Sequence, residues 1–291
     1  MKVAVFGASG TIGEPLLADL AREHDIVAVS RNERSDSGNV TWKVADATDR
    51  DSLARVLEGV EVLYYLVHSL GSADFEGRDL EAAEKTASEA ERAGVKQLVY
   101  LGGLGDDSPD LSRHLRSRRE TGKRLASTSV PVTTLRAAMV VGRGSAAFET
   151  IVALVNRLPA MVTPRWVSTR TQPIALPDAL AYLSGVCGLD AAFGGEYDVG
   201  GPEVMTYREM IERIARLRGK HPIIVEVPVL TPRLSSLWLH LVTPVNAGVA
   251  RPLIEGLRNE TVAHDDRIRQ LLPIELTPFD VAARTALEPP E

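Results

Sequence analysis

The chain has 291 residues, enough for one large α/β domain or for a domain with a smaller lobe. Hydrophobic residues make up 44% and charged residues 25%, so a folded protein is expected rather than a disordered one. A net charge of −6 disfavours a nucleic-acid partner, because such a surface needs a basic stripe. The single cysteine, Cys187, excludes an intrachain disulfide and a cysteine-built metal site.

The chain gives no targeting or membrane signal. Residues 1–6 lead directly into a glycine turn, without the apolar stretch of a signal peptide. The nearest approach to a membrane span, residues 223–249, is interrupted by prolines, Arg233 and His240. We therefore expect a soluble, cytoplasmic protein. The six histidines are scattered without ligand spacing, and no metal site is expected.

The first half alternates short apolar runs with segments of helical period, which is typical of a parallel sheet covered by helices. Strands are predicted at residues 2–6, 25–30, 40–44, 62–67, 97–101 and 132–136. Helices are predicted at residues 12–22, 52–57, 79–93 and 115–127. Ser52 is expected to cap the second helix and Gly94 to end the third. Residues 1–142 are thus predicted to form a Rossmann-type, doubly wound parallel sheet.

Beyond Gly142 prolines break this rhythm. Helices are still predicted at residues 147–156, 178–187 and 207–217. Residues 143–291 are expected to form a smaller substrate lobe, with some segments returning to the main sheet. The apolar, proline-broken residues 225–249 could cover a hydrophobic substrate, dock a protein or a membrane surface, or fill the core of this lobe.

A glycine-rich turn separates the first predicted strand from the first helix. Gly7 permits a tight turn, Gly10 lets the backbone approach a phosphate, and Gly13 lets the helix pack closely on the strand. The free amides at the helix start, at the positive end of its dipole, then face a diphosphate. The residues predicted to bind it are Gly7, Ser9, Gly10, Thr11, Ile12 and Gly13.

The end of the second strand favours NADP over NAD. An NAD site usually has an acid there to accept from the ribose 2′-hydroxyl, whereas this chain continues with Ser30, Arg31 and Asn32. Arg31 can offer paired donors to a 2′-phosphate, and Arg34 can add charge, although Glu33 opposes it. The alternative is that these arginines are ordinary surface charges.

Two further strand ends are candidates for the cofactor site. Asp46, after the third strand, corresponds to an acid that lies against the adenine in related proteins, or it simply caps the local turn. Leu66, Val67 and His68 end the fourth strand and are expected beside the cofactor's ribose, because ligands bind at the carboxyl ends of strands near a switch point.

Several strings resemble the atypical and extended short-chain dehydrogenase/reductases, in particular the NmrA-like proteins and accessory subunits of respiratory complex I. These are the Gly-x-x-Gly-x-x-Gly turn, residues 100–104 and 114–118, and the later residues 172–178 and 197–202. The resemblance covers nearly the whole chain and is strongest from residue 1 to residue 142. It implies the fold and the cofactor more closely than the reaction.

The resemblance also shows where this chain departs from the catalytic members of the family. Those members use a serine near the end of the fifth strand and a Tyr-x-x-x-Lys pair on the next helix. Here His114 and Arg118 occupy the positions of the pair, and the serine position falls within Gly102 and Gly103. A histidine can exchange a proton near neutral pH, and an arginine keeps the charge that would hold the ribose but cannot relay a proton.

Two functions and one trivial alternative follow. The first is an NADPH-dependent oxidoreductase that moves hydride to or from a small apolar carbonyl, quinone or enone, with His114 as proton donor and Arg118 orienting the ribose. The second is a catalytically silent NADP(H)-binding protein with a redox-sensing, assembly or scaffold role. In the trivial alternative, His114 has no function and is one of several basic residues exposed to solvent at the start of a helix.

Overall fold

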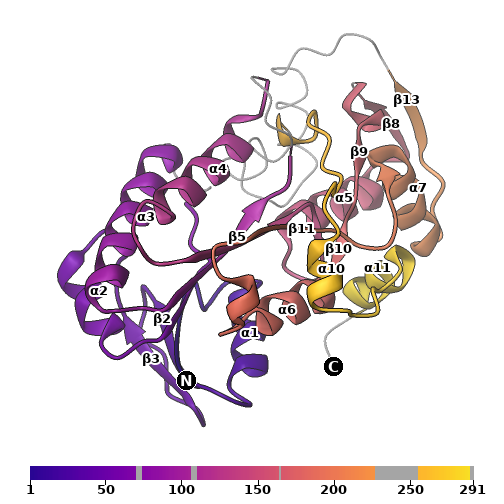
Figure 1. The fold of residues 1–291 in the computed structure, drawn as a ribbon. Helices are drawn as coiled ribbons and strands as arrows, with labels where there is room; N and C mark the ends of the chain where they lie inside the picture. The colour runs from indigo at the N-terminus through magenta and orange to yellow at the C-terminus, as the bar shows by residue number, and fades with distance from the viewer. Residues whose placement is uncertain (70–73, 106–109, 164, 227–254, 289–291) are drawn as a thin grey trace.

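A parallel β-sheet forms the centre of the molecule in the computed structural model, which describes residues 1–69, 74–105, 110–163, 165–226 and 255–288 (Figure 1). Within these residues the sheet has seven strands in the order β11-β6-β5-β4-β1-β2-β3, and every neighbouring pair is parallel. The order reverses direction between β1 and β4, and in such sheets ligands bind outside the carboxyl ends of the strands at this switch point. The bounds are β1 Lys2–Phe6, β2 Asp25–Ser30, β3 Val40–Val44, β4 Val62–Tyr65, β5 Gln97–Gly103, β6 Val132–Ala137 and β11 Glu196–Val199.

Helices cover both faces of this sheet (Figure 1). On one face α1 (Gly13–Leu20) and α6 (Leu176–Gly185) bury leucines against the strands. On the other face lie α2 (Arg50–Leu57), α3 (Phe75–Arg92) and α4 (Arg113–Leu125). The central strands are apolar on both sides, as expected for a sheet buried between two helical layers.

A third hydrophobic core belongs to a smaller lobe built from the second half of the chain. Its helices are α5 (Ala146–Arg157), α7 (Tyr207–Leu217) and α11 (Phe279–Leu287), with α10 (Arg267–Leu271) near β11. Short strands pair two by two around them. These pairs are β7 (Val140–Val141) with β10 (Ile174–Ala175), β9 (Arg170–Thr171) with β12 (Met205–Thr206), and β8 (Ala160–Thr163) with β13 (Ile223–Glu226).

The predicted fold class is confirmed, with differences at the ends of elements. Ser52 does not cap α2: Asp49 occupies that position and accepts from the Asp51 amide, while the Ser52 hydroxyl lies inside the helix and donates to the Asp49 carbonyl. Asp74 caps α3, which begins at Phe75, four residues before the expected start at residue 79. The strand expected over residues 62–67 ends at Tyr65, because the chain turns there toward the glycine turn.

Most of the apolar region at residues 225–249 lies outside the described residues. Its first two residues belong to β13, where Val225 is exposed. Among the residues that the structure does describe, no helix combines the length and the apolar character needed to cross a membrane.

Candidate functional site

The glycine turn between β1 and α1 has the geometry of a phosphate cradle. Gly7 has a φ of +82°, and its carbonyl accepts from the Gly10 amide at 3.0 Å, which closes the turn. A Cβ on Gly7 would lie 2.9 Å from the Leu66 backbone, and one on Gly13 would lie 2.3 Å from the Gly7 carbonyl oxygen. A Cβ on Gly10 would meet only that same oxygen, at 3.2 Å. Gly7 and Gly13 are thus fixed by the protein itself, whereas Gly10 faces outward.

No side chain caps the start of α1, although the Glu14 amide donates to the Gly10 carbonyl at 3.0 Å and Pro15 has no amide hydrogen. The helix begins at Gly13, and Ile12 at its N-cap provides no side-chain hydrogen bond to the first turn. Ser9 is exposed beside Gly10. The Thr11 hydroxyl donates to the Gly144 carbonyl at 2.9 Å and so joins the turn to the loop before α5. An open backbone with uncapped amides fits the diphosphate of a dinucleotide.

The two candidate arginines for a 2′-phosphate follow β2 and are both reachable. Arg31 is exposed immediately after Ser30, whose hydroxyl is engaged with the Asn32 carbonyl. The Arg34 guanidinium lies 5.0 Å from the centre of the Trp42 ring and 3.9 Å from the Glu14 carboxylate. Trp42 was not among the predicted site residues, although its place in a short edge strand beside these arginines was a usable signal.

Asp46 has a well-defined local role. Its carboxylate accepts from both the amide and the hydroxyl of Thr48, each at 2.8 Å. These two hydrogen bonds, and the positive charges of Arg78 and Arg31, hold the pKa of Asp46 below its ordinary value. The carboxylate is exposed, so the predicted contact with an adenine stays a prediction.

The segment after β4 connects the glycine turn to α4. Leu66 contributes the backbone that Gly7 approaches, and its amide donates to the Phe6 carbonyl at 3.0 Å. Val67 packs against the core between the sheet and α2, α3 and α4. His68 then turns toward the start of α4.

His68 and His114 lie side by side, with ring centroids 6.1 Å apart and planes tilted by 47°. His114 is half-buried, whereas His68 is exposed beside it. Displacement of water by the surrounding protein, followed by the charge of Arg118, lowers the pKa of His114 to about 4. The same two causes and the nearby His114 lower the pKa of His68 to about 3. Both rings are neutral at pH 7, and the ordinary pKa near 6.5 does not apply to His114.

Arg118 lies one turn beyond His114 and is held by β5. Its guanidinium donates to the Leu101 carbonyl and stacks over the Tyr100 ring at 5.0 Å. The Tyr100 hydroxyl donates to the Arg118 carbonyl at 2.8 Å. A Cβ on Gly103 would lie 2.9 Å from a Leu115 methyl carbon, so α4 packs too closely on the end of β5 to admit the serine found in catalytic relatives without a shift.

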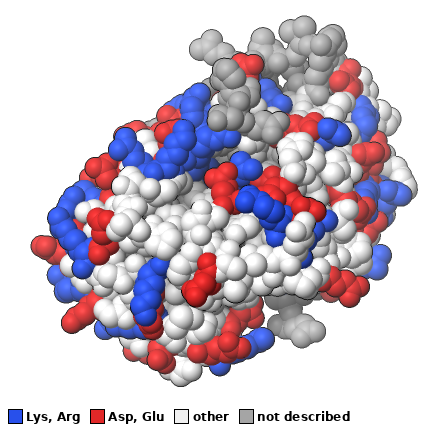
Figure 2. Space-filling model, viewed as in Figure 1, with Lys and Arg blue, Asp and Glu red and all other residues white. Residues whose placement is uncertain are grey.

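The outward side of α4 is strongly basic. Figure 2 shows Lys and Arg side chains gathered over this helix. Acids of α3 balance part of the charge: Arg113 pairs with Glu76 at 2.9 Å and Arg124 with Glu84 at 3.5 Å. His114 belongs to the same run in sequence, but its ring faces His68 rather than this solvated side.

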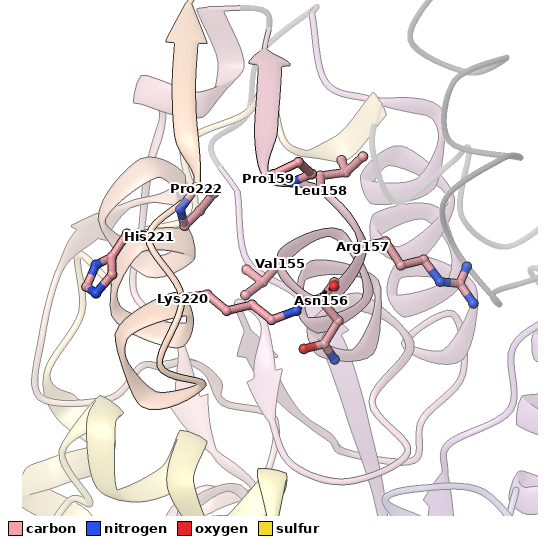
Figure 3. Close-up of a pocket in the computed structure, with 8 residues that line it drawn as sticks. All are labelled: Val155, Asn156, Arg157, Leu158, Pro159, Lys220, His221 and Pro222. Carbon is pink, nitrogen blue, oxygen red and sulfur yellow. Dashed lines mark hydrogen bonds between the residues drawn. The ribbon is translucent and has the colours of Figure 1, made fainter.

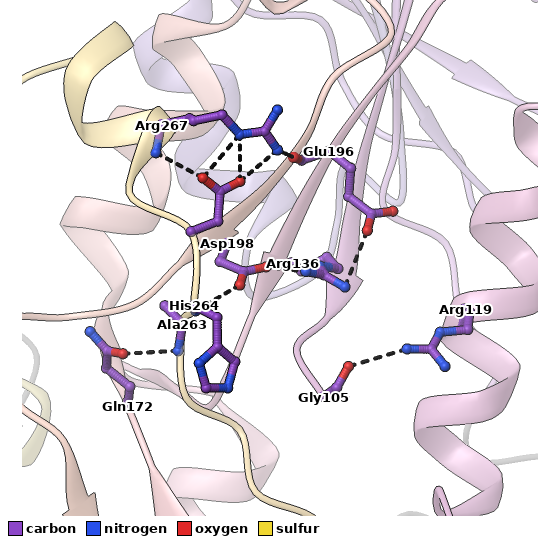
Figure 4. Close-up of polar contacts among 10 residues, drawn as sticks. Gly105, Arg119, Arg136, Gln172, Glu196, Asp198, Ala263, His264 and Arg267 are labelled. Carbon is purple, nitrogen blue, oxygen red and sulfur yellow. Dashed lines mark hydrogen bonds and ion pairs between the residues drawn. The ribbon is translucent and has the colours of Figure 1, made fainter. Parts of the chain in front are cut away.

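The C-terminal segment fastens the smaller lobe to the edge of the sheet (Figure 4). Arg136 on β6 pairs with Asp198 on β11 at 2.5 Å and with Glu196 at 3.1 Å. The buried Asp198 carboxylate also accepts from the His264 amide at 3.0 Å, and Arg267 donates to the Glu196 carbonyl at 2.7 Å. These contacts hold residues 264–267 beside the edge strand β11.

A separate pocket of about 290 Å³ lies in the smaller lobe, between the end of α5 and the start of β13. Figure 3 shows Arg157 and His221 pointing outward on opposite sides, while Lys220 reaches the Asn156 carbonyl. Its polar groups do not converge on a common point, as they would in a specific ligand site. The lining residues are Val155, Asn156, Arg157, Leu158, Pro159, Lys220, His221 and Pro222.

The parallel sheet, its switch point and the glycine turn define a Rossmann-type nucleotide-binding protein. Residues 7–150 match the family model described as NAD(P)H-binding. Over nearly its whole length the chain superposes on a nucleoside-diphosphate-sugar epimerase of Staphylococcus aureus, with a TM-score of 0.79, 16% identity and coverage of 98% and 100% of the two chains. It superposes similarly on the triphenylmethane reductase of Citrobacter sp. complexed with NADP(H), with a TM-score of 0.76, 19% identity and coverage of 99% and 100%.

Two relatives match in sequence. One is the mitochondrial NADH dehydrogenase [ubiquinone] 1 alpha subcomplex subunit 9 of Arabidopsis thaliana, 25% identical over 77% of this chain but only 60% of that protein's length. The other is (4-alkanoyl-5-oxo-2,5-dihydrofuran-3-yl)methyl phosphate reductase of Streptomyces griseus subsp. griseus, 27% identical over 75% of this chain and 74% of its own. Residues 7–150 thus match an NAD(P)H-binding family, and the chain as a whole has the fold of the epimerase and of the triphenylmethane reductase.

Proposed function

We propose that this protein is an NADP(H)-dependent oxidoreductase acting on a small apolar carbonyl, quinone or enone. The observation that carries the proposal is the segment of residues 66–69, which touches the glycine turn through Leu66 and His114 through His68. This segment supports the proposal because it brings His114, a side chain able to exchange a proton, near the turn proposed to bind the diphosphate. Bound NADP(H) supplies or takes up the hydride.

Different residues bind the cofactor and exchange the proton. In this proposal the amides at the start of α1 hold the diphosphate, and Arg31 and Arg34 hold the 2′-phosphate that distinguishes NADP from NAD. His114 exchanges the proton with the substrate oxygen. Its neutral ring at pH 7 accepts a proton from an alcohol, and the imidazolium needed for reduction becomes populated as the pH falls toward 4.

The pH dependence of turnover tests this assignment. With a panel of quinones, enones and small carbonyls, the rate of NADPH oxidation should rise as the pH is lowered from 7 to 5. The His114→Gln variant should be slower and lose that rise, while its affinity for NADPH stays the same. The His221→Ala variant, altered on the exposed pocket rim, is the matched control. A His114→Gln variant that matches the parent in rate and pH profile would remove His114 from the reaction.

A second candidate function is supported by one specific observation. Both imidazoles are neutral at pH 7, and the Arg118 guanidinium is engaged with the Leu101 carbonyl. A site in this state suits an NADP(H)-binding sensor or assembly subunit that performs no turnover. That function predicts tight NADPH binding with no oxidation of NADPH by any member of the panel at any pH from 5 to 8.

A further inference from the structure

The start of α4 is fastened by a residue from the other end of the chain. The Asn259 side-chain oxygen accepts from the Ser112 amide at 2.9 Å, and its side-chain nitrogen donates to the Asp110 carbonyl at 3.2 Å. The Ser112 hydroxyl in turn accepts from the Leu115 amide and caps the helix. His114 is the second residue of that helix.

The segment that carries Asn259 is itself anchored to the smaller lobe. Glu260 makes two hydrogen bonds to the Arg170 guanidinium, at 2.7 and 3.0 Å. The Thr261 hydroxyl donates to that of Thr171 at 2.8 Å in a buried contact. The Thr261 backbone continues the contact, because its amide donates to the Arg170 carbonyl and its carbonyl accepts from the Gln172 amide. Asn259 therefore extends from a fixed backbone.

An asparagine suits this place because it offers one acceptor and one donor at the same time. A helix start leaves amides without partners inside the helix, and such ends fray unless other groups hold them. Asn259 binds one amide and one carbonyl on the two sides of Leu111, which fixes the direction in which the chain enters α4.

We propose that Asn259 is a positioning residue for His114: by holding the Asp110–Ser112 backbone it keeps the His114 ring against His68. The inference rests on the proposed function, in which His114 exchanges the substrate proton. Through the same contacts, the smaller lobe takes part in forming the reactive end of the nucleotide-binding half.

Histidine NMR tests the structural step without any substrate. The His114 ring signal is assigned by its loss in His114→Ala. In Asn259→Ala that signal should move and titrate nearer pH 6.5, because a loosened helix start admits water around the ring. The signals of His24 and His221 should stay in place. Asn259→Asp, which keeps the acceptor for Ser112 but loses the donor to Asp110, should give a smaller shift. The Gln270→Ala variant, altered on the exposed side of α10, is the control.

Kinetics separate this inference from the proposed function on which it rests. Asn259→Ala should lower kcat at least about fivefold with little change in the KM for NADPH, and it should add nothing in a His114→Ala background. An unmoved His114 signal in Asn259→Ala, or equal losses of kcat in both backgrounds, would overturn the role of Asn259. If His114→Ala keeps the parent rate, the proposed function fails instead, and only the NMR result bears on Asn259.

Discussion

The glycine turn between β1 and α1 keeps the pattern of the family, whereas the end of β5 and the start of α4 depart from it. The turn keeps all three glycines, and two of them are fixed by close backbone contacts. At the end of β5 and on α4, the residues that the family resemblance aligns with the catalytic serine, tyrosine and lysine are one of Gly102 and Gly103, His114 and Arg118. Cofactor binding depends on backbone geometry that few substitutions preserve, whereas the reactive groups are side chains that can be exchanged on an unchanged backbone.

The largest expected effect separates two glycines within the turn. Gly13→Ala would place a Cβ 2.3 Å from the Gly7 carbonyl oxygen, and we expect it to lower the free energy of unfolding by about 2–4 kcal/mol. Gly10→Ala should change that free energy by less than about 1 kcal/mol, yet weaken NADPH binding at least about tenfold, because its Cβ points where the diphosphate lies. Urea unfolding and calorimetry measure the two effects. Equal stability of the two variants would contradict the assignment of a structural role to Gly13 and a binding role to Gly10.

A smaller effect concerns the choice of cofactor. Arg31→Ala should weaken NADPH binding by about 1–3 kcal/mol and leave NADH binding nearly unchanged, because only NADPH carries the 2′-phosphate. Arg22→Ala, which removes an exposed arginine of the same half that pairs only locally with Asp19, serves as the control. Equal losses for the two nucleotides would remove Arg31 from 2′-phosphate recognition.

The smallest expected effect concerns His114 on α4 and the stability of the protein in acid. The folded-state pKa of His114, about 4, is below the value near 6.5 expected in the unfolded chain. The unfolded chain therefore binds more protons between these values, and the folded protein loses stability as the pH falls from 6.5 to 4. His114→Gln should remove on the order of 1–2 kcal/mol of this loss, measured by urea unfolding at pH 7 and pH 5. An unchanged difference between the two pH values would show that His114 does not carry it.

The secondary structure was predictable from the sequence where the local pattern is strong, as in the strands of the first half. The strands at residues 2–6 and 25–30 were predicted with the bounds they have, because buried parallel strands are short, apolar and framed by turns. The bounds of the strand at residues 40–44 were also predicted, although it is a partly exposed edge strand. Helix starts were less accurate. Asp49 and Ser52 are both good capping residues, and only the backbone shows that Asp49 caps the helix. In the smaller lobe β7, β9, β10 and β12 have two residues each, too few for any periodicity.

The candidate site was predictable in parts. The glycine turn and the positions of His114 and Arg118 follow from spacing, because a motif of neighbouring residues fixes its own geometry. The approach of His68 to His114 does not, since it depends on the path of an irregular segment after β4. Asn259 carries no motif at all. It lies 147 residues beyond Ser112, and only the folded chain brings the two together.

Calorimetric titration of the parent protein with NADPH and with NADH, repeated on Gly10→Ala, tests most directly whether the turn at β1 holds a phosphorylated dinucleotide. The account predicts one NADPH per chain, bound about tenfold or more tightly than NADH, with both affinities reduced in the variant. Heat from neither nucleotide at millimolar concentration, or tighter binding of NADH than of NADPH, would contradict it.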